Sequence, residues 1–211
     1  MPGAFFIARH GETVFNAAGR IQGDAGHTPL TRAGFAQAEA MGLALLERLG
    51  PRPALALWAS PTGRALQTLA VIAEHLGLDW HQARTDARLG EIGMGEWTGF
   101  RYADIVAEGG PVYDPVTRLF SRRPPGGETY GEVAARLSAW LDDHGAEQGD
   151  RLILMHGMSA RVLRALLTGA APHPACGVPV APDVTQGSVV EVEAGRERVL
   201  HEGAGGGSAW K

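Results

Sequence analysis

Three short polar segments contain the side chains that bind and transfer phosphate in many enzymes. They are Arg9-His10-Gly11-Glu12, Ser60-Pro61-Thr62-Gly63-Arg64 and His156-Gly157. Guanidinium groups form charge-assisted hydrogen bonds with phosphoryl oxygens. A neutral imidazole is a nucleophile, and two neighbouring arginines lower the pKa of a histidine and so favour the neutral form. These residue types predict an anion site that also contains two histidines.

Each polar segment follows a short apolar run, at residues 4–8, 54–59 and 152–155. Continuous apolar runs of this length are typical of strands buried on both faces of a parallel sheet. Ligands of open α/β sheets bind beyond the carboxyl ends of the strands. We therefore expect Arg9, His10, Arg64 and His156 to meet in one pocket.

Helical patterns follow the same apolar runs. Thr31 can cap a helix that ends near residue 49, and residues 158–167 form another helix. Ser60, with Pro61 at the first helical position, predicts a helix that ends near residue 76. Strands that alternate with helices in this way predict an α/β layered fold.

Two further patterns complete the predicted fold. Thr129 and Glu132 have capping-box spacing, which predicts a helix over residues 129–144. Residues 188–193 and 196–201 alternate in part, which predicts an antiparallel pair at the sheet edge. The expected fold class is α/β, a three-layer α/β/α domain over residues 1–202 whose mostly parallel sheet has an antiparallel edge strand. Residues 203–211 are expected to form a flexible tail.

The position of Arg64 argues for a bound anion. It falls in the first turn of its predicted helix, where the helix dipole disfavours a cation by roughly a few tenths of a kcal/mol. A phosphoryl group would offset this cost, and backbone N–H groups at the starts of this helix and of the helix after His156 are additional anion donors. We expect bidentate contacts from Arg9 and Arg64 to the phosphoryl oxygens.

In order along the chain, these motifs resemble those of the histidine phosphatase superfamily, which has the phosphoglycerate mutase-like fold. The resemblance covers nearly the whole chain and includes Arg9-His10-Gly11-Glu12-Thr13 with Asn16, Arg20-x-Gln22-Gly23, Leu30-Thr31 with Gly34, Ser60 to Thr68, Leu89 to Gly99, and Met155-His156-Gly157. It implies that His10 attacks phosphorus to form a phosphohistidine. It also implies that Arg9, Arg64 and His156 hold the phosphoryl oxygens, and that Glu91 protonates the leaving alcohol.

Two carboxylates compete for the role of general acid. Glu91 and Glu96 lie in the same motif, and alignment with the family favours Glu91, which follows Leu89-Gly90. A general acid must hold a proton, and a neighbouring phosphate dianion favours the protonated carboxyl. The family often has arginine where Gly90 stands, so no side chain at this position can supply that contact.

The remaining candidate contacts come from loops. Asn16, Gln22, Gly23 and Gly157 are assigned to phosphate or substrate binding, although loops favour such residue types regardless of ligand. The pattern weakens between Gly99 and Gly127, which we interpret as a variable excursion over the site. Its arginines could recognise a second anionic group on the substrate or form a solvated charged loop; they are Arg118, Arg122 and Arg123.

Two other functions remain open. A phosphoglycerate mutase shares the first step and passes the phosphoryl group to another hydroxyl, and the Arg122-Arg123 pair keeps this alternative open. The mutases of this family carry a lysine and a paired arginine that bind the substrate carboxylate, but this chain has no lysine between Met1 and Trp210. Residues 124–129 also resemble the phosphatase branch. Both features favour hydrolysis of small phosphomonoesters. The second alternative is a noncatalytic phosphate-binding module, which would be expected to lack His10 or Glu91.

Composition limits the remaining possibilities. The net charge of -4 argues against a nucleic-acid partner or an anionic membrane surface. The single cysteine, Cys176, cannot form an internal disulfide, and no apolar run is long enough for a membrane span, so cytoplasm is the expected location. No metal or other cofactor is expected, because the histidines outside the motifs lack convincing metal-ligand spacing. The sequence does not indicate the oligomeric state.

Overall fold

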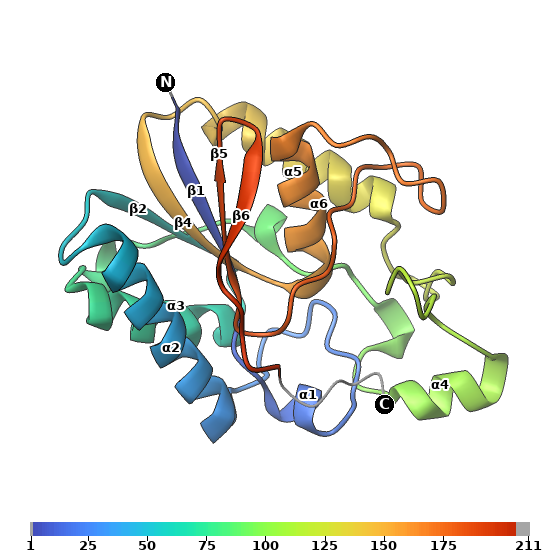
Figure 1. Cartoon of the computed structure of the whole chain (residues 1–211). Coiled ribbons are helices and arrows are strands. Elements are labelled where there is room, and N and C mark those ends of the chain that lie inside the picture. The colour runs from blue at the N-terminus through green and yellow to red at the C-terminus, as the bar shows by residue number, and fades with distance from the viewer. Residues whose placement is uncertain (1, 206–211) are drawn as a thin grey trace.

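A six-stranded sheet lies between two pairs of helices in the computed structural model, which describes residues 2–205 (Figure 1). The order of strands across the sheet is β3-β2-β4-β1-β5-β6. The strands are β1 (Pro2–Arg9), β2 (Leu55–Ala59), β3 (Arg84–Thr85), β4 (Gly149–Met155), β5 (Val189–Glu193) and β6 (Arg196–His201). The first four pair in parallel, and β5 runs antiparallel to both β1 and β6. This arrangement confirms the predicted α/β fold class.

The helices begin and end largely where capping residues predict. They are α1 (Val14–Ala17), α2 (Arg32–Leu49), α3 (Gly63–Leu76), α4 (Tyr102–Gly109), α5 (Tyr130–His144) and α6 (Gly157–Thr168). The side chain of Thr31 caps α2, and Thr129 forms the predicted capping box with Glu132. The predicted start of α3 at Pro61 is wrong. Ser60 still donates its N–H to the Leu154 carbonyl of β4, so the chain remains extended and the helix begins after Thr62.

Alternate residues of the central strands face two separate apolar layers. Phe6, Leu152 and Leu154 lie in one buried cluster with residues of α2 and α3. Phe5 and Ile153 lie in the other cluster, with residues of α5 and α6. Because successive side chains of a strand point to opposite faces, each central strand contributes to both layers. This burial on both faces explains why β1 and β4 are almost continuously apolar in sequence.

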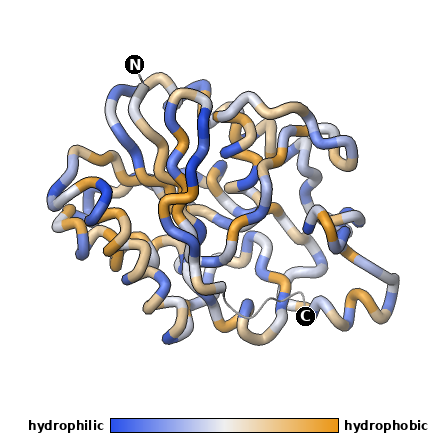
Figure 2. The backbone as a smooth tube through the Cα atoms, viewed as in Figure 1, coloured by the Kyte–Doolittle hydropathy of each residue, from blue (hydrophilic) through white to orange (hydrophobic). Residues whose placement is uncertain are grey.

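The sheet ends in an exposed strand. In β6 the first four residues are exposed, and Figure 2 shows that much of this strand is hydrophilic. Charged side chains on an edge strand oppose pairing with another chain. Beyond β6, Gly203 is buried, donates its N–H to Ser188 Oγ and accepts a hydrogen bond from Thr185. Residues 206–211 of the predicted tail lie outside the described residues.

The excursion between residues 99 and 127 contains structure that its sequence pattern did not indicate. Helix α4 lies well to one side of the sheet in Figure 1, and Tyr113 forms an isolated bridge with Phe120. Only Ile105 of α4 is buried. A helix of eight residues with one buried side chain has little apolar periodicity, which explains why the sequence did not reveal it.

Candidate active site

The carboxyl ends of β1, β4 and β2 bring the predicted catalytic segments together. Strand β4 lies between the other two, and Arg9 is paired with Met155 and Ala59 with Leu154. His10 and His156, which follow β1 and β4, have ring centroids 5.2 Å apart. The pocket expected from strand order is therefore present.

His10 has the geometry of a neutral nucleophile. Its Nδ1 lies 2.7 Å from the Gly11 carbonyl oxygen, which can only accept a hydrogen bond, so Nδ1 carries the proton and Nε2 keeps its lone pair. The side chain is 3% exposed. Burial and the neighbouring charge of Arg64 lower the pKa of His10 well below 6.5, although the bond to Gly11 opposes this shift.

His156 has the complementary tautomer. Arg64 Nε donates to His156 Nδ1 at 3.2 Å, so the proton of a neutral His156 lies on Nε2. That Nε2 atom is buried and has no hydrogen-bond partner in the part of the chain that the structure describes. Burial, followed by the charge of Arg64, lowers the pKa of His156 well below 6.5. His156 can therefore donate one hydrogen bond to an anion.

Arg64 is committed mainly to the protein. Besides its bond to His156, NH1 donates to the Ala25 carbonyl and to Thr28 Oγ1, and NH2 donates to the Gly23 carbonyl. Burial lowers the pKa of Arg64 to about 10, so it stays charged at neutral pH. One of its five N–H groups is left for an anion. In this arrangement Arg64 offers an anion one N–H group, whereas the bidentate contact expected from the sequence needs two.

Arg9 has more donors available. Its NH1 donates to the Val184 carbonyl at 3.1 Å, and the same NH1 lies 3.9 Å from Asp183 Oδ1. Its Nε is buried without a hydrogen-bond partner among the described residues. An unpaired buried donor beside His10 is a natural ligand for a phosphoryl oxygen.

The carboxylate of Glu91 packs against the N-terminus of α6, where it accepts hydrogen bonds from backbone N–H groups. Oε1 accepts from Ser159 at 3.0 Å and both oxygens lie 3.1 Å from the Met158 nitrogen. These are N–H groups that we expected to bind phosphate, so the carboxylate occupies that position itself. Glu91 lines the same cavity as His10, whereas Glu96 is exposed and does not line it. The geometry favours Glu91 of the two candidate acids.

The other predicted contacts divide into residues that face the cavity directly and residues that support it. Asn16 and Gln22 line the cavity and are linked through Thr13. Gly23 also lines it, and its carbonyl accepts the bond from Arg64. Its positive φ of 50°, and the close approach of Met94, leave no room for a side chain. Gly157, the first residue of α6, borders the cavity beside Arg9.

The cavity has a volume of about 810 Å³, far more than a phosphate group needs. It includes residues that sequence reasoning did not assign. Gln186 bonds to the Gly11 carbonyl at 3.2 Å and to Asn16 at 2.7 Å, and Tyr102 of α4 is another lining residue. Neither lies in a recognisable motif, and only the folded chain brings them to the site.

The three arginines of the excursion have different environments. Arg118 lines the cavity, and within the described chain its guanidinium has no hydrogen-bond or ion-pair partner. Arg122 instead lies over the Trp97 ring at 5.2 Å and donates to the carbonyls of Gly109 and Gly110. Arg123 donates to Gly127 and pairs with Glu132. Neither Arg122 nor Arg123 lines the main cavity.

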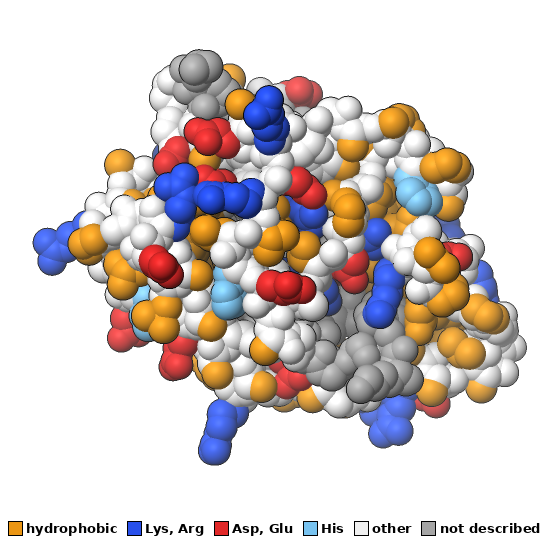
Figure 3. All heavy atoms as spheres, viewed as in Figure 1, with side chains coloured by type: hydrophobic (Ala, Val, Ile, Leu, Met, Phe, Trp, Pro, Cys, Tyr) orange, Lys and Arg blue, Asp and Glu red, His pale blue; other side chains and the backbone are white. Residues whose placement is uncertain are grey.

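Among residues 2–205 no group of three or more histidine, cysteine or acidic side chains is arranged to hold a metal ion. None of the described helices has the length and apolar character of a membrane span. On the face shown in Figure 3, acidic and basic side chains are interspersed.

The fold and the site define an α/β protein in which two histidines and two arginines meet at one cavity. The chain belongs to the histidine phosphatase superfamily, because the model of its branch 1 matches residues 5–204. The chain is 34% identical over 176 residues to a glucosyl-3-phosphoglycerate phosphatase of Mycobacterium tuberculosis, covering 76% of this chain and 73% of that one. It is 32% identical over 171 residues to a probable phosphoglycerate mutase of Yersinia enterocolitica, covering 80% and 76%.

Two further comparisons fit this assignment. The chain is 32% identical over 180 residues to a 6-phosphofructo-2-kinase/fructose-2,6-bisphosphatase of Caenorhabditis elegans; the match covers 85% of this chain and 36% of that longer protein. A solved structure described as mycobacterial hydrolase 1 superposes with a TM-score of 0.72 at 28% identity, covering 97% of this chain and 99% of the other. The similarities thus include hydrolases and a mutase-like relative.

Proposed function

We propose that this chain hydrolyses small phosphomonoesters through a phosphohistidine on His10. The observation that carries the proposal is the hydrogen bond from His10 Nδ1 to the Gly11 carbonyl, which leaves the lone pair on Nε2 of a buried ring. Arg9, Arg64 and His156 offer donors in the same place. Positioning and electrostatic stabilisation are the main contributions to phosphoryl transfer, and this arrangement supplies both.

The proposed reaction has two steps. His10 Nε2 attacks phosphorus, the ester P–O bond breaks, and Glu91 gives its proton to the departing oxygen. Water then attacks the phosphohistidine and returns a proton to Glu91. The P–N bond breaks, which releases phosphate and restores neutral His10. None of these steps requires a metal ion or another cofactor.

Hydrolysis is favoured over mutase chemistry by the surroundings of Arg122 and Arg123. These two side chains kept the mutase alternative open in the sequence, but both are engaged with other groups outside the main cavity. The similarity to a probable phosphoglycerate mutase means that transfer to a second hydroxyl must still be measured beside phosphate release.

The substrate is proposed to be a small phosphorylated metabolite with a body larger than the phosphate group, since the cavity measures about 810 Å³. The relatives act on phosphorylated sugars or sugar acids according to their names, which is compatible with such a body. We also propose a cytoplasmic protein without nucleic-acid or membrane partners, on the basis of its net charge and single cysteine.

The test is to trap the intermediate and to vary the leaving group. Wild-type protein mixed with substrate and quenched in alkali should carry phosphate on His10, detectable by mass spectrometry of the peptide, and His10→Ala should carry none and turn over no substrate. Glu91→Gln should lose about 10²–10⁴-fold in kcat/KM for an alkyl phosphate and far less for p-nitrophenyl phosphate, whose leaving group needs no proton.

Several outcomes would contradict the proposal. Equal losses on both substrates would remove Glu91 as the acid. Binding of phosphorylated ligand without a phosphohistidine or phosphate release would indicate the noncatalytic alternative. Transfer to a phosphoglycerate acceptor faster than hydrolysis would indicate a mutase.

A further inference from the structure

The loop that carries Glu91 is held by a second segment, residues 124–128, which the proposed reaction does not use. The Glu128 N–H donates to the Gly93 carbonyl at 2.8 Å, and the Gly93 N–H donates to Glu128 Oε2 at 2.7 Å. Three residues further along, the Glu96 N–H donates to the Pro125 carbonyl at 3.0 Å. The two segments are therefore joined by backbone and side-chain hydrogen bonds over several residues.

Glycine is required where these two segments approach each other. A Cβ on Gly127 would lie 2.7 Å from the Gly93 carbonyl oxygen, and one on Gly95 would overlap the Pro125 carbonyl. Gly95 also has a positive φ of 47°. Gly127 of the Pro-Pro-Gly-Gly-Glu sequence therefore allows this segment to pack directly against the Glu91 loop.

Arg136 of α5 binds both segments with one guanidinium. It forms a bidentate pair with Glu128, with Nε 2.9 Å from Oε1 and NH2 3.1 Å from Oε2. The same NH2 donates to the Glu91 backbone carbonyl at 3.1 Å, and NH1 donates to the Arg88 carbonyl. The side chains of Arg136 and Glu128 are 18% and 30% exposed. A planar fork with this many fixed donors restricts the loop more than a single point charge could.

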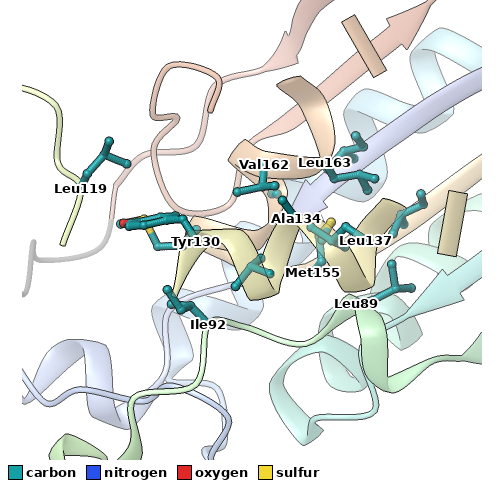
Figure 4. Close-up of a cluster of buried hydrophobic side chains, with 14 of the residues drawn as sticks. Leu89, Ile92, Leu119, Tyr130, Ala134, Leu137, Met155, Val162 and Leu163 are labelled. Atoms are coloured by element: carbon teal, nitrogen blue, oxygen red, sulfur yellow. The ribbon is translucent and has the colours of Figure 1, made fainter. Parts of the chain in front are cut away.

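Apolar contacts add to this attachment. Leu89 and Ile92, on either side of Glu91, are buried in the same cluster as Ala134 and Leu137 of α5. Figure 4 shows both side chains beside that helix. The backbone of Glu91 is therefore held from the α5 side, while its carboxylate is held by the N–H groups of Met158 and Ser159 at the start of α6.

We infer that Glu128 and Arg136 are positioning residues for proton transfer by Glu91. Neither residue lines the main cavity itself, and they act by fixing the Glu91 carbonyl and the preceding turn from which the Glu91 side chain extends. This inference rests on the proposed role of Glu91 as the acid. A displacement of about 1 Å in such a group costs about 100-fold in rate, so the pair should matter for catalysis even though it does not contact substrate.

The test compares leaving groups in Glu128→Gln, Arg136→Met and Arg123→Met proteins. Glu128→Gln keeps the shape of the side chain but removes the charge from the bidentate pair. Both Glu128→Gln and Arg136→Met should lose on the order of 10-fold to 100-fold in kcat for glycerol 2-phosphate, and less than about 3-fold for p-nitrophenyl phosphate. Arg123→Met is the matched control, because Arg123 binds the same segment through Gly127 and pairs with Glu132 but has no hydrogen bond to the Glu91 loop.

A double-mutant cycle separates positioning from a general effect on folding. In a Glu91→Gln background, Arg136→Met should cause no further selective loss on glycerol 2-phosphate. The inference would be overturned if folded Glu128→Gln lost equal activity on both substrates. It would also be overturned if Arg136→Met caused the same selective loss in the Glu91→Gln background as in the wild type. Neither result would affect the proposed function itself. If Glu91→Gln itself shows no dependence on the leaving group, the assignment of the acid fails as well. Should Arg136→Met not fold, Glu128→Gln decides the question by itself.

Discussion

The two buried histidines have opposite tautomers because each is fixed by a different neighbour. The Gly11 carbonyl accepts from His10 Nδ1, whereas Arg64 donates to His156 Nδ1. One ring therefore presents a lone pair on Nε2 and the other presents a proton there. The proposed nucleophile and a hydrogen-bond donor thus come from the same residue type, and the difference comes from the backbone turn after β1 and the side chain of Arg64.

Both histidines should make stability depend on pH. Their pKa values are well below 6.5 in the folded protein, whereas in the unfolded chain they return to about 6.5. Above pH 6.5 neither state gains a proton. Below it the unfolded chain binds protons that the folded protein does not, so each histidine lowers the free energy of unfolding by up to about 1.4 kcal/mol per pH unit until its folded pKa is reached.

The measurement is thermal unfolding between pH 7.5 and pH 5. The melting temperature should fall as the pH is lowered from 7.5 to 5. The slope of melting temperature against pH should be smaller in His10→Gln and in His156→Gln than in the wild type. His81→Gln, a substitution at an exposed position, is the control for loss of a histidine. An unchanged slope in both buried-site variants would show that these histidines are not the source of the dependence.

At the level of elements, the sequence predicted the parts of the fold that follow from local chemistry. Thr31 and Thr129 identified two helix starts, because a capping hydroxyl acts within three residues. Apolar runs identified β1, β2 and β4, and with them the meeting of His10 and His156. The helix α4 and the cavity contacts of Gln186 depend on tertiary packing, so no local pattern could reveal them.

Residues 112–121 of the excursion should supply specificity through Arg118. This residue has a positive φ of 58°, and buried Arg161 donates to the carbonyls of Thr117 and Arg118 beside it. A strained residue held by its surroundings is often functional. With Arg118 in the cavity, 4-carboxyphenyl phosphate should be hydrolysed with about 10-fold higher kcat/KM than phenyl phosphate, as expected for a hydrogen bond to a charged group.

The matched variants are Arg118→Met and Arg122→Met. Arg118→Met should raise the KM for 4-carboxyphenyl phosphate until the preference is lost. The kcat/KM for phenyl phosphate should stay unchanged. Arg122, which lies over Trp97 outside the cavity, should be replaceable without effect on the preference. A preference that survives Arg118→Met would assign the second anion to another group or exclude it.

At the level of the whole molecule, the site joins segments that are distant in the chain. Arg9 is the last residue of β1, Arg64 lies in the first turn of α3, and Gly157 is the first residue of α6. All three line the same cavity. An anion that contacts all three segments adds a direct link that the unfolded chain cannot make. Binding to the folded state alone stabilises it by mass action, by about 2.7 kcal/mol at a ligand concentration 100 times Kd.

Vanadate should therefore both inhibit and stabilise the protein. It resembles the five-coordinate phosphoryl transfer state, and it should raise the melting temperature in proportion to the logarithm of its concentration. EDTA should change neither the rate nor the melting temperature without vanadate, because Arg9, Arg64 and His156 supply the positive charge and donors that a metal ion would otherwise provide. Arg64→Met should remove most of the vanadate-induced rise, since it also leaves His156 Nδ1 and the Gly23 carbonyl without their donor. Strict dependence on added Mg²⁺ would contradict this account, because the anion would then be held by a metal ion and not by side chains that the fold brings together.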